Sequence, residues 1–178
     1  MKVALGLLIL MAFVSSGETV LSYHDNTPHW LTWGGTYRGT WFHVEDFVPG
    51  ATEYSIDWVD LWFYELSDQV YLELWNGVIA PTEFLASEAV SSCQYPNATR
   101  VYFDPSVVTG PDFCCVLNTS ASSGTTSILA DGTPDGHSQF SDDFIVWEEF
   151  DPGEYFISAG SFDSSLQGVS WGGIKALF

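Results

Sequence analysis

Apolar side chains recur at every second position along most of the chain, in short runs broken by Gly, Pro, Asn and Asp. Such alternation predicts β-strands with one buried face, separated by turns. No amphipathic helical pattern accompanies it. The pattern predicts an all-β fold, an antiparallel two-sheet β-sandwich of jelly-roll type with about 8 to 10 strands and little or no helix. Strands are expected at 40–48, 54–65, 70–75, 83–91, 99–103, 112–118, 127–130, 144–148 and 154–159.

The strands predicted at 54–65 and 70–75 define a candidate binding face. A change of phase in the first strand predicts a β-bulge near Trp58. The second strand is expected to pair with the first as a hairpin across residues 66–69. Val59, Leu61, Phe63, Val70, Leu72 and Leu74 then face inward. The outward faces bring together a set of four rings, which we call the aromatic platform: Trp62, Tyr64, Tyr71 and Trp75.

The aromatic platform has three interpretations. Flat rings stack on the apolar faces of sugars, and Asp60 and Glu73 beside them would accept hydrogen bonds from sugar hydroxyls. Rings exposed against another subunit would instead be interface hot spots. The third interpretation is that this face packs beneath a second sheet or a loop, as most Trp does.

Residues 1–17 form the pattern of a secretory signal peptide. Lys2 precedes an apolar run from Val3 to Val14, and small residues follow. At about 1.5 Å per residue such a run does not cross a hydrocarbon core of roughly 30 Å. We therefore expect an extracellular or cell-surface protein, without membrane insertion after signal cleavage. Residues 18–178 should form one domain with its core at about 20–162 and an extra strand or tail at 163–178.

Composition and charge exclude several classes of function. The chain has 4 Lys plus Arg against 23 Asp plus Glu, a net charge of −19, and 16% aromatic residues. Without a basic stripe, binding to nucleic acid or to anionic lipid is excluded. The high hydrophobic content also excludes intrinsic disorder. The acids are expected mainly to keep an aromatic-rich protein soluble.

The cysteines and acids suggest two structural sites. Export would place the cysteines in an oxidising compartment, so Cys93 is expected to form a disulfide with Cys114 or Cys115, with three free thiols as the alternative. The four histidines are scattered, which argues against zinc. Structural calcium is the one metal considered, the alternative being an ordinary Asp-Gly turn, and its candidate ligands are Asp131, Asp135, Asp142 and Asp143.

Signatures of catalysis are weak. No Gly-x-Ser-x-Gly motif occurs, and His137 beside Ser138 or His43 near Glu45 is only a fragment of a catalytic triad. Paired acids would suit an acidic-cleft hydrolase, but such pairs are expected by chance in a chain with 23 acids. We therefore expect a chain that is not an enzyme. The pairs in question are Glu45-Asp46, Asp142-Asp143 and Glu148-Glu149.

Several aromatic and turn patterns, taken in order, resemble an accessory β-sandwich module of secreted and cell-surface bacterial proteins. The resemblance covers roughly residues 22–162 and implies a non-catalytic unit, often appended to extracellular peptidases or placed before a C-terminal sorting domain. We expect neither companion domain within these 178 residues. The patterns are Tyr23 to Pro28, Trp33 to Gly35, Phe42 to Val44, Val59 to Tyr64, Val70 to Gly77, Gly110 to Phe113, Asp131 to Thr133, Trp147 and Gly153 to Ile157.

The sequence thus predicts a secreted, non-catalytic module that binds polysaccharide or an extracellular protein partner through an aromatic-rich face. One alternative is a self-associating structural subunit of an extracellular fibre or surface layer. In that case the leader at 18–23 or the tail at 170–178 would add an edge strand to a neighbour. The acidic-cleft hydrolase is the other alternative.

Overall fold

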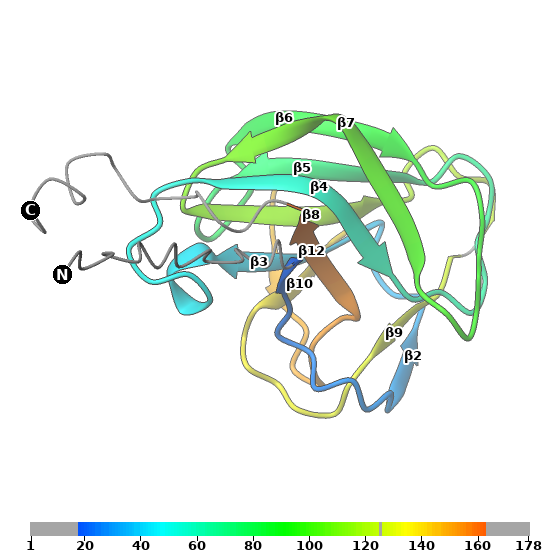
Figure 1. Cartoon of the computed structure of the whole chain (residues 1–178). Helices are drawn as coiled ribbons and strands as arrows, with labels where there is room; N and C mark the ends of the chain where they lie inside the picture. The colour runs from blue at the N-terminus through cyan, green and yellow to red at the C-terminus, as the bar shows by residue number, and fades with distance from the viewer. Residues whose placement is uncertain (1–17, 125, 163–178) are drawn as a thin grey trace, which may run out of the picture.

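The computed structural model describes residues 18–124 and 126–162. Two antiparallel sheets pack face to face around a hydrophobic core (Figure 1), which confirms the predicted all-β sandwich. One 3-10 turn, η1 (Val44–Asp46), is the only helical element within the described ranges. Within the same ranges, no helix is both long and apolar enough to span a membrane. The predicted signal peptide and the tail at 163–178 lie outside the described residues.

In the described part of the chain, twelve strands build two large sheets and a two-stranded ribbon. The first sheet has the order β1-β12-β4-β7, the second has the order β11-β10-β3-β8-β5-β6, and β2 with β9 forms a two-stranded ribbon. The strands are β1 (Thr19–Leu21), β2 (Trp30–Thr32), β3 (Tyr37–His43), β4 (Tyr54–Leu61), β5 (Tyr71–Asn76), β6 (Glu83–Ala89), β7 (Thr99–Thr109), β8 (Asp112–Asn118), β9 (Ile128–Ala130), β10 (Ser138–Ser141), β11 (Glu148–Glu149) and β12 (Ile157–Ser161).

Three strands were not predicted from the sequence, and one strand that was predicted is largely absent. β1, β2 and β10 are short and lack a clear apolar alternation, so their pairing partners define them. The strand predicted at 144–148 is mostly a turn. There the Asp143 carboxylate accepts hydrogen bonds from the amides of Ile145 and Val146, at 2.8 and 2.9 Å, and Phe144 has φ of 66°. Local side-chain bonds outweigh strand propensity at this point.

The predicted hairpin between β4 and β5 is wrong. β4 pairs with β12 and β7, whereas β5 pairs with β8 and β6 in the other sheet. Residues 62–70 carry the chain from one layer to the other. Alternation identified the buried face of each strand correctly but carries no information about which layer the strand joins. The two inward faces therefore meet across the core instead of lying side by side.

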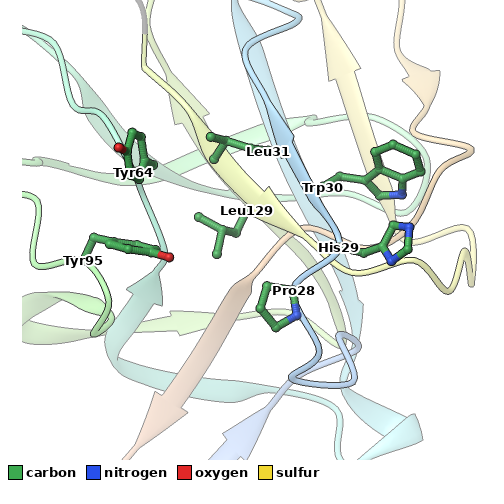
Figure 2. Close-up of a pocket in the computed structure, with 7 residues that line it drawn as sticks. All are labelled: Pro28, His29, Trp30, Leu31, Tyr64, Tyr95 and Leu129. Atoms are coloured by element: carbon green, nitrogen blue, oxygen red, sulfur yellow. The ribbon is translucent and has the colours of Figure 1, made fainter.

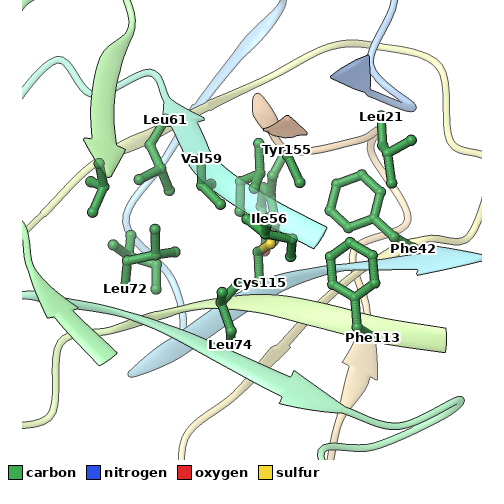
Figure 3. Packing of buried hydrophobic residues seen from close by; sticks show 14 of the residues in the cluster. Leu21, Phe42, Ile56, Val59, Leu61, Leu72, Leu74, Phe113, Cys115 and Tyr155 are labelled. Carbon is green, nitrogen blue, oxygen red and sulfur yellow. The ribbon is translucent and has the colours of Figure 1, made fainter. Parts of the chain in front are cut away.

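The core fills the space between the two large sheets. Figure 3 shows side chains from both layers converging there, among them Leu61, Leu72 and Phe113. Phe113 stacks on Phe42 with 5.1 Å between ring centroids. The six residues predicted to face inward on β4 and β5 and in the link between them are all buried. The register shift between Ile56 and Trp58 confirms the predicted bulge.

The leader takes part in this fold. Residues 19–21 pair along β12, with Leu21 opposite Ala159 and fully buried. In this structure the leader therefore extends the chain's own sheet as an edge strand.

Trp58 occupies a tight site on the outer side of the first sheet. Its ring lies against Gly160 of β12, and the Arg100 guanidinium covers it at 3.5 Å from the ring centroid. Arg100 in turn makes two 2.8 Å hydrogen bonds to the two carboxylate oxygens of Asp60 and one of 3.0 Å to Glu18. The indole is thus clamped between a glycine and a paired cation.

We expect Gly160→Ala to destabilise the protein, because a Cβ there would lie 2.0 Å from Cζ2 of Trp58. Overpacking of this kind costs about 1 to 3 kcal/mol in the free energy of unfolding, measured by urea denaturation. The matched control is Gly34→Ala, where the nearest atom would be 4.0 Å away. Equal stability of the two variants would contradict the clamp.

Candidate functional site

The structure separates the aromatic platform into two halves. Trp62 and Tyr64 follow β4 of the first sheet, whereas Tyr71 and Trp75 lie on β5 of the second. Because the inward faces of these strands meet in the core, their outward faces point to opposite sides of the sandwich. The prediction of one continuous four-ring surface is therefore wrong.

The β5 half packs largely against its own chain. Trp75 contacts Phe84 and Phe144 with centroid distances of 5.1 and 5.0 Å, and its indole N–H donates to Glu73 at 2.9 Å. Trp75 packs against the small cluster of Trp41, Cys114 and Val116, as do Phe144 and Trp147 from the loop after β10. For Trp75 the third interpretation, packing beneath a loop, describes the structure. Tyr71 remains 36% exposed.

The β4 half contributes to a concave surface. Two adjoining depressions, of about 190 and 240 Å³, share Pro28, Tyr95 and Leu129 as lining residues. We call the combined surface the Tyr64–Tyr95 groove. The first depression is lined by Tyr64 and Leu31, and the second by Asn26, Trp62 and Phe156.

Figure 2 shows how the first depression is built. The rings of Tyr64 and Tyr95 stand on one side, Leu31 and Leu129 face them from the β2–β9 ribbon, and Pro28 lies below. The two tyrosine rings meet edge to face, with 5.4 Å between centroids and an interplanar angle of 77°. They are 55% and 51% exposed. The site thus offers two half-exposed aromatic faces above an aliphatic floor.

Backbone hydrogen bonds fix the position of the groove. The Ser127 hydroxyl, fully buried, accepts the amide protons of Tyr64 and Glu65 at 3.1 and 2.8 Å. The Leu129 amide donates to the Trp62 carbonyl at 3.0 Å. The ribbon strand β9 therefore holds the segment after β4 in place, which preorganises the rings for binding.

A buried histidine lies behind the groove. His24 stacks on Phe156 with 4.2 Å between centroids, and its Nε2 lies 2.9 Å from the Ser158 hydroxyl. Trp62 packs edge-on against the same two rings. Burial penalises the charged imidazolium and lowers the pKa of His24 to about 4, despite the nearby carboxylates of Asp131 and Asp25.

Acid should therefore weaken the fold through His24. As pH falls, the unfolded chain takes up this proton near pH 6.5 while the folded chain does so near its lowered pKa of about 4. The stabilisation present above pH 6.5 is lost on the way to pH 4. Between pH 7 and 5 the free energy of unfolding should fall by about 2 kcal/mol because of this group. His24→Gln should remove this fall from the pH dependence measured by urea unfolding. His29→Gln, at an exposed histidine, is the control. An unchanged slope in His24→Gln would contradict the assignment.

The acids expected beside the rings are engaged elsewhere. Asp60 is held by Arg100, and Glu73 accepts hydrogen bonds from Trp75 and from the Asn118 amide at 2.6 Å. Neither lines the groove. The polar groups among the lining residues are instead the Tyr64 and Tyr95 phenols, the Asn26 amide and the His29 imidazole.

The four candidate calcium ligands do not converge. Within residues 18–124 and 126–162, no group of three or more His, Cys, Asp or Glu side chains is arranged to hold a metal ion. Asp131 is fully buried and accepts three backbone amide protons, whereas Asp135, Asp142 and Asp143 are exposed. For Asp131 and Asp143 the alternative of turn-capping side chains describes the structure.

The histidines near the predicted triad fragments have other partners. His43 Nδ1 lies 2.6 Å from Asp112 Oδ1, and His137 stacks on Tyr23 with 3.5 Å between centroids. Ser138 is buried, and its hydroxyl accepts the Tyr155 amide proton at 2.7 Å. Neither fragment forms a hydrogen-bonded nucleophile–base pair in the described structure.

The cysteines do not form the expected disulfide. All three are free thiols: Cys114 and Cys115 are buried on opposite faces of β8, and Cys93 is exposed, with its thiol donating to the Phe63 carbonyl at 3.3 Å. Burial raises the pKa of both Cys114 and Cys115. Cys114 and Cys115 point to opposite faces because successive side chains of a strand do so. Cys93 lies outside β8 and forms a disulfide with neither of them.

We expect a thiol reagent to label one cysteine per folded chain and all three after denaturation. Cys93 should react because it is exposed, and the buried thiols should not, because both burial and a raised pKa suppress the thiolate. Labelling with and without guanidinium, counted by mass spectrometry, tests this expectation. Cys93→Ser should abolish labelling of the folded chain, while fewer than three reactive thiols after denaturation would restore the disulfide hypothesis.

Comparison with family models, with curated proteins and with solved structures finds no match to this chain. The resemblance to accessory modules of bacterial surface proteins therefore stays a prediction, and the site is interpreted from its own geometry. Sequence reasoning found Trp62 and Tyr64 but missed Tyr95, Leu31 and Leu129. Tyr95 lies in a loop without alternation, and no local pattern links that loop to the β2–β9 ribbon.

Proposed function

We propose that this chain is a secreted, non-catalytic β-sandwich module that binds polysaccharide in the Tyr64–Tyr95 groove. The observation that carries the proposal is the pair of half-exposed tyrosine rings standing over a concave aliphatic floor. Exposed aromatic side chains gathered at a concavity are a common sign of a binding site. The secretory part of the proposal rests on residues 1–17.

The chemistry of the groove suits a sugar chain. A pyranose ring has apolar C–H faces that pack on aromatic rings and a rim of hydroxyls that exchange hydrogen bonds. Tyrosine supplies both, because its ring is apolar and its phenol both donates and accepts. Two adjoining depressions joined at Tyr95 would hold consecutive sugar units. The residues that line the two depressions include no Asp, Glu, Lys or Arg, which favours a neutral polysaccharide at this site.

We expect Tyr64→Ala combined with Tyr95→Ala to lower affinity for the bound sugar about tenfold or more, since each aromatic contact is worth roughly 0.5 to 1.5 kcal/mol beyond its buried area. Titration calorimetry with neutral cello-, xylo-, manno- and chito-oligosaccharides measures the affinity. The matched control is Tyr71→Ala, which removes an exposed tyrosine from the other sheet.

Two outcomes would overturn this proposal. One is an unchanged affinity in the double variant, with its fold verified by circular dichroism. The other is the absence of binding to every member of the panel by the wild-type chain. Loss of affinity in Tyr71→Ala alone would transfer the site to the β5 half of the aromatic platform.

A further inference from the structure

A second hollow, of about 380 Å³, opens at one end of the six-stranded sheet. It lies among the loops that follow β2, β8 and β10 and the start of β3, and shares no lining residue with the Tyr64–Tyr95 groove. Its wall carries several hydroxyls, one indole, one cation and the carboxylate of Asp142. We call it the Arg38 pocket, and its lining includes Trp33, Thr36, Arg38, Thr119, Ser120 and Ser122.

The cation of this pocket is buried and has no acidic partner. Arg38 is 1% exposed, and its Nη1 donates to the Thr32 carbonyl at 3.1 Å. Its Nε is buried without a hydrogen-bond partner. Among the side chains of residues 18–124 and 126–162, no carboxylate forms an ion pair with it. The Tyr155 hydroxyl, which interacts electrostatically with Arg38, is also buried without a partner.

An unpaired buried guanidinium is unexpected in this chain. Acids outnumber Lys plus Arg by 23 to 4, and the other arginine of the sandwich, Arg100, pairs with both Asp60 and Glu18. Burial lowers the pKa of Arg38 to about 10, so the group stays charged at neutral pH. Burying an uncompensated charge costs several kcal/mol. Among the described residues, the charge of Arg38 has a backbone carbonyl partner but no carboxylate partner.

Hydrogen bonds between the loops that follow β2, β8 and β10 hold the rim of the pocket. The Thr119 hydroxyl donates to the Thr36 carbonyl at 2.8 Å, and the Thr36 amide donates to Asp142 at 3.2 Å. Asp142 is thereby engaged at the rim, while Ser120 is exposed and Ser122 half-buried. Trp33 adds an indole that is 46% exposed.

We propose that the Arg38 pocket binds the carboxylate of a hydroxylated ligand of the uronic acid class. The carboxylate would accept from the Arg38 guanidinium where it lines the pocket, while ligand hydroxyls would exchange hydrogen bonds with the Ser and Thr hydroxyls of the rim. Arg38 is the one cation and Asp142 the one carboxylate among the lining residues, so a monoanion adds less charge repulsion than a dianion. Phosphate would bring a second negative charge into a chain of net charge −19 with no further cation in the pocket. The site is independent of the proposed neutral-sugar groove.

Titration calorimetry at about 0.15 M salt, where long-range repulsion from the acidic surface is screened, tests the proposal. The probes are galacturonate, glucuronate and trigalacturonate, each compared with its neutral methyl ester, and inorganic phosphate. We expect at least one acid to bind about tenfold more tightly than its ester, since a hydrogen bond to a charged group contributes about 1.5 to 3 kcal/mol. This comparison uses the unaltered chain, so it does not depend on the folding of any variant.

Variants locate the site. Arg38→Met should abolish the preference for acid over ester, and Ser120→Phe, at an exposed rim position, should block binding without altering the core. The control is Ala121→Phe, at an exposed neighbour that does not line the pocket. The double variant of Tyr64 and Tyr95 should retain uronate binding, which separates the two sites. Equal affinity for acid and ester, no binding of any uronate, tighter binding of phosphate, or full binding in Ser120→Phe would each overturn the proposal.

Discussion

The buried carboxylate of Asp131 joins the loops at one end of the sandwich. Its Oδ1 accepts the amide protons of Thr133 and Glu154, at 3.0 and 2.8 Å, and its Oδ2 accepts that of Asp25 at 2.9 Å. Gly153 passes so close that a Cβ there would lie 2.1 Å from the Asp131 carbonyl. A buried carboxylate is tolerated when it is hydrogen-bonded, and here two of the three donors, Asp25 and Glu154, come from segments distant in sequence. β2 begins and β9 ends beside Asp131. The groove that these two strands line therefore depends on the hydrogen bonds of Asp131.

The placement of β4 and β5 in two facing sheets also determines much of the structure. Because β4 and β5 belong to different sheets, their apolar faces form the core jointly and their aromatic faces diverge. One aromatic half then becomes a groove with Tyr95, and the other supports the packing of Trp41 and Trp147 against the second sheet. The same arrangement leaves Cys93 apart from the cysteines of β8.

Charge in this protein serves two distinct purposes. Most acids are exposed, and several cap turns: Asp143 holds the loop after β10, and Asp68 binds the amide and hydroxyl of Ser123. The two arginines of the sandwich differ sharply in their surroundings. Arg100 lies on the surface with two carboxylates and covers Trp58, whereas Arg38 is enclosed and faces a pocket of hydroxyls.

The sequence by itself determined the strand content, the buried face of β4 and β5, the bulge at Trp58 and the absence of a basic surface, because each follows from local alternation or from composition. Only the tertiary structure decided which strands share a sheet, and hence that Tyr64 meets Tyr95 and not Trp75. Alternation has a period of two in either layer, so it cannot encode the layer itself. The sequence also could not predict that Arg38 lacks an ion-pair partner, because the partners of a side chain depend on its three-dimensional surroundings and not on a local pattern.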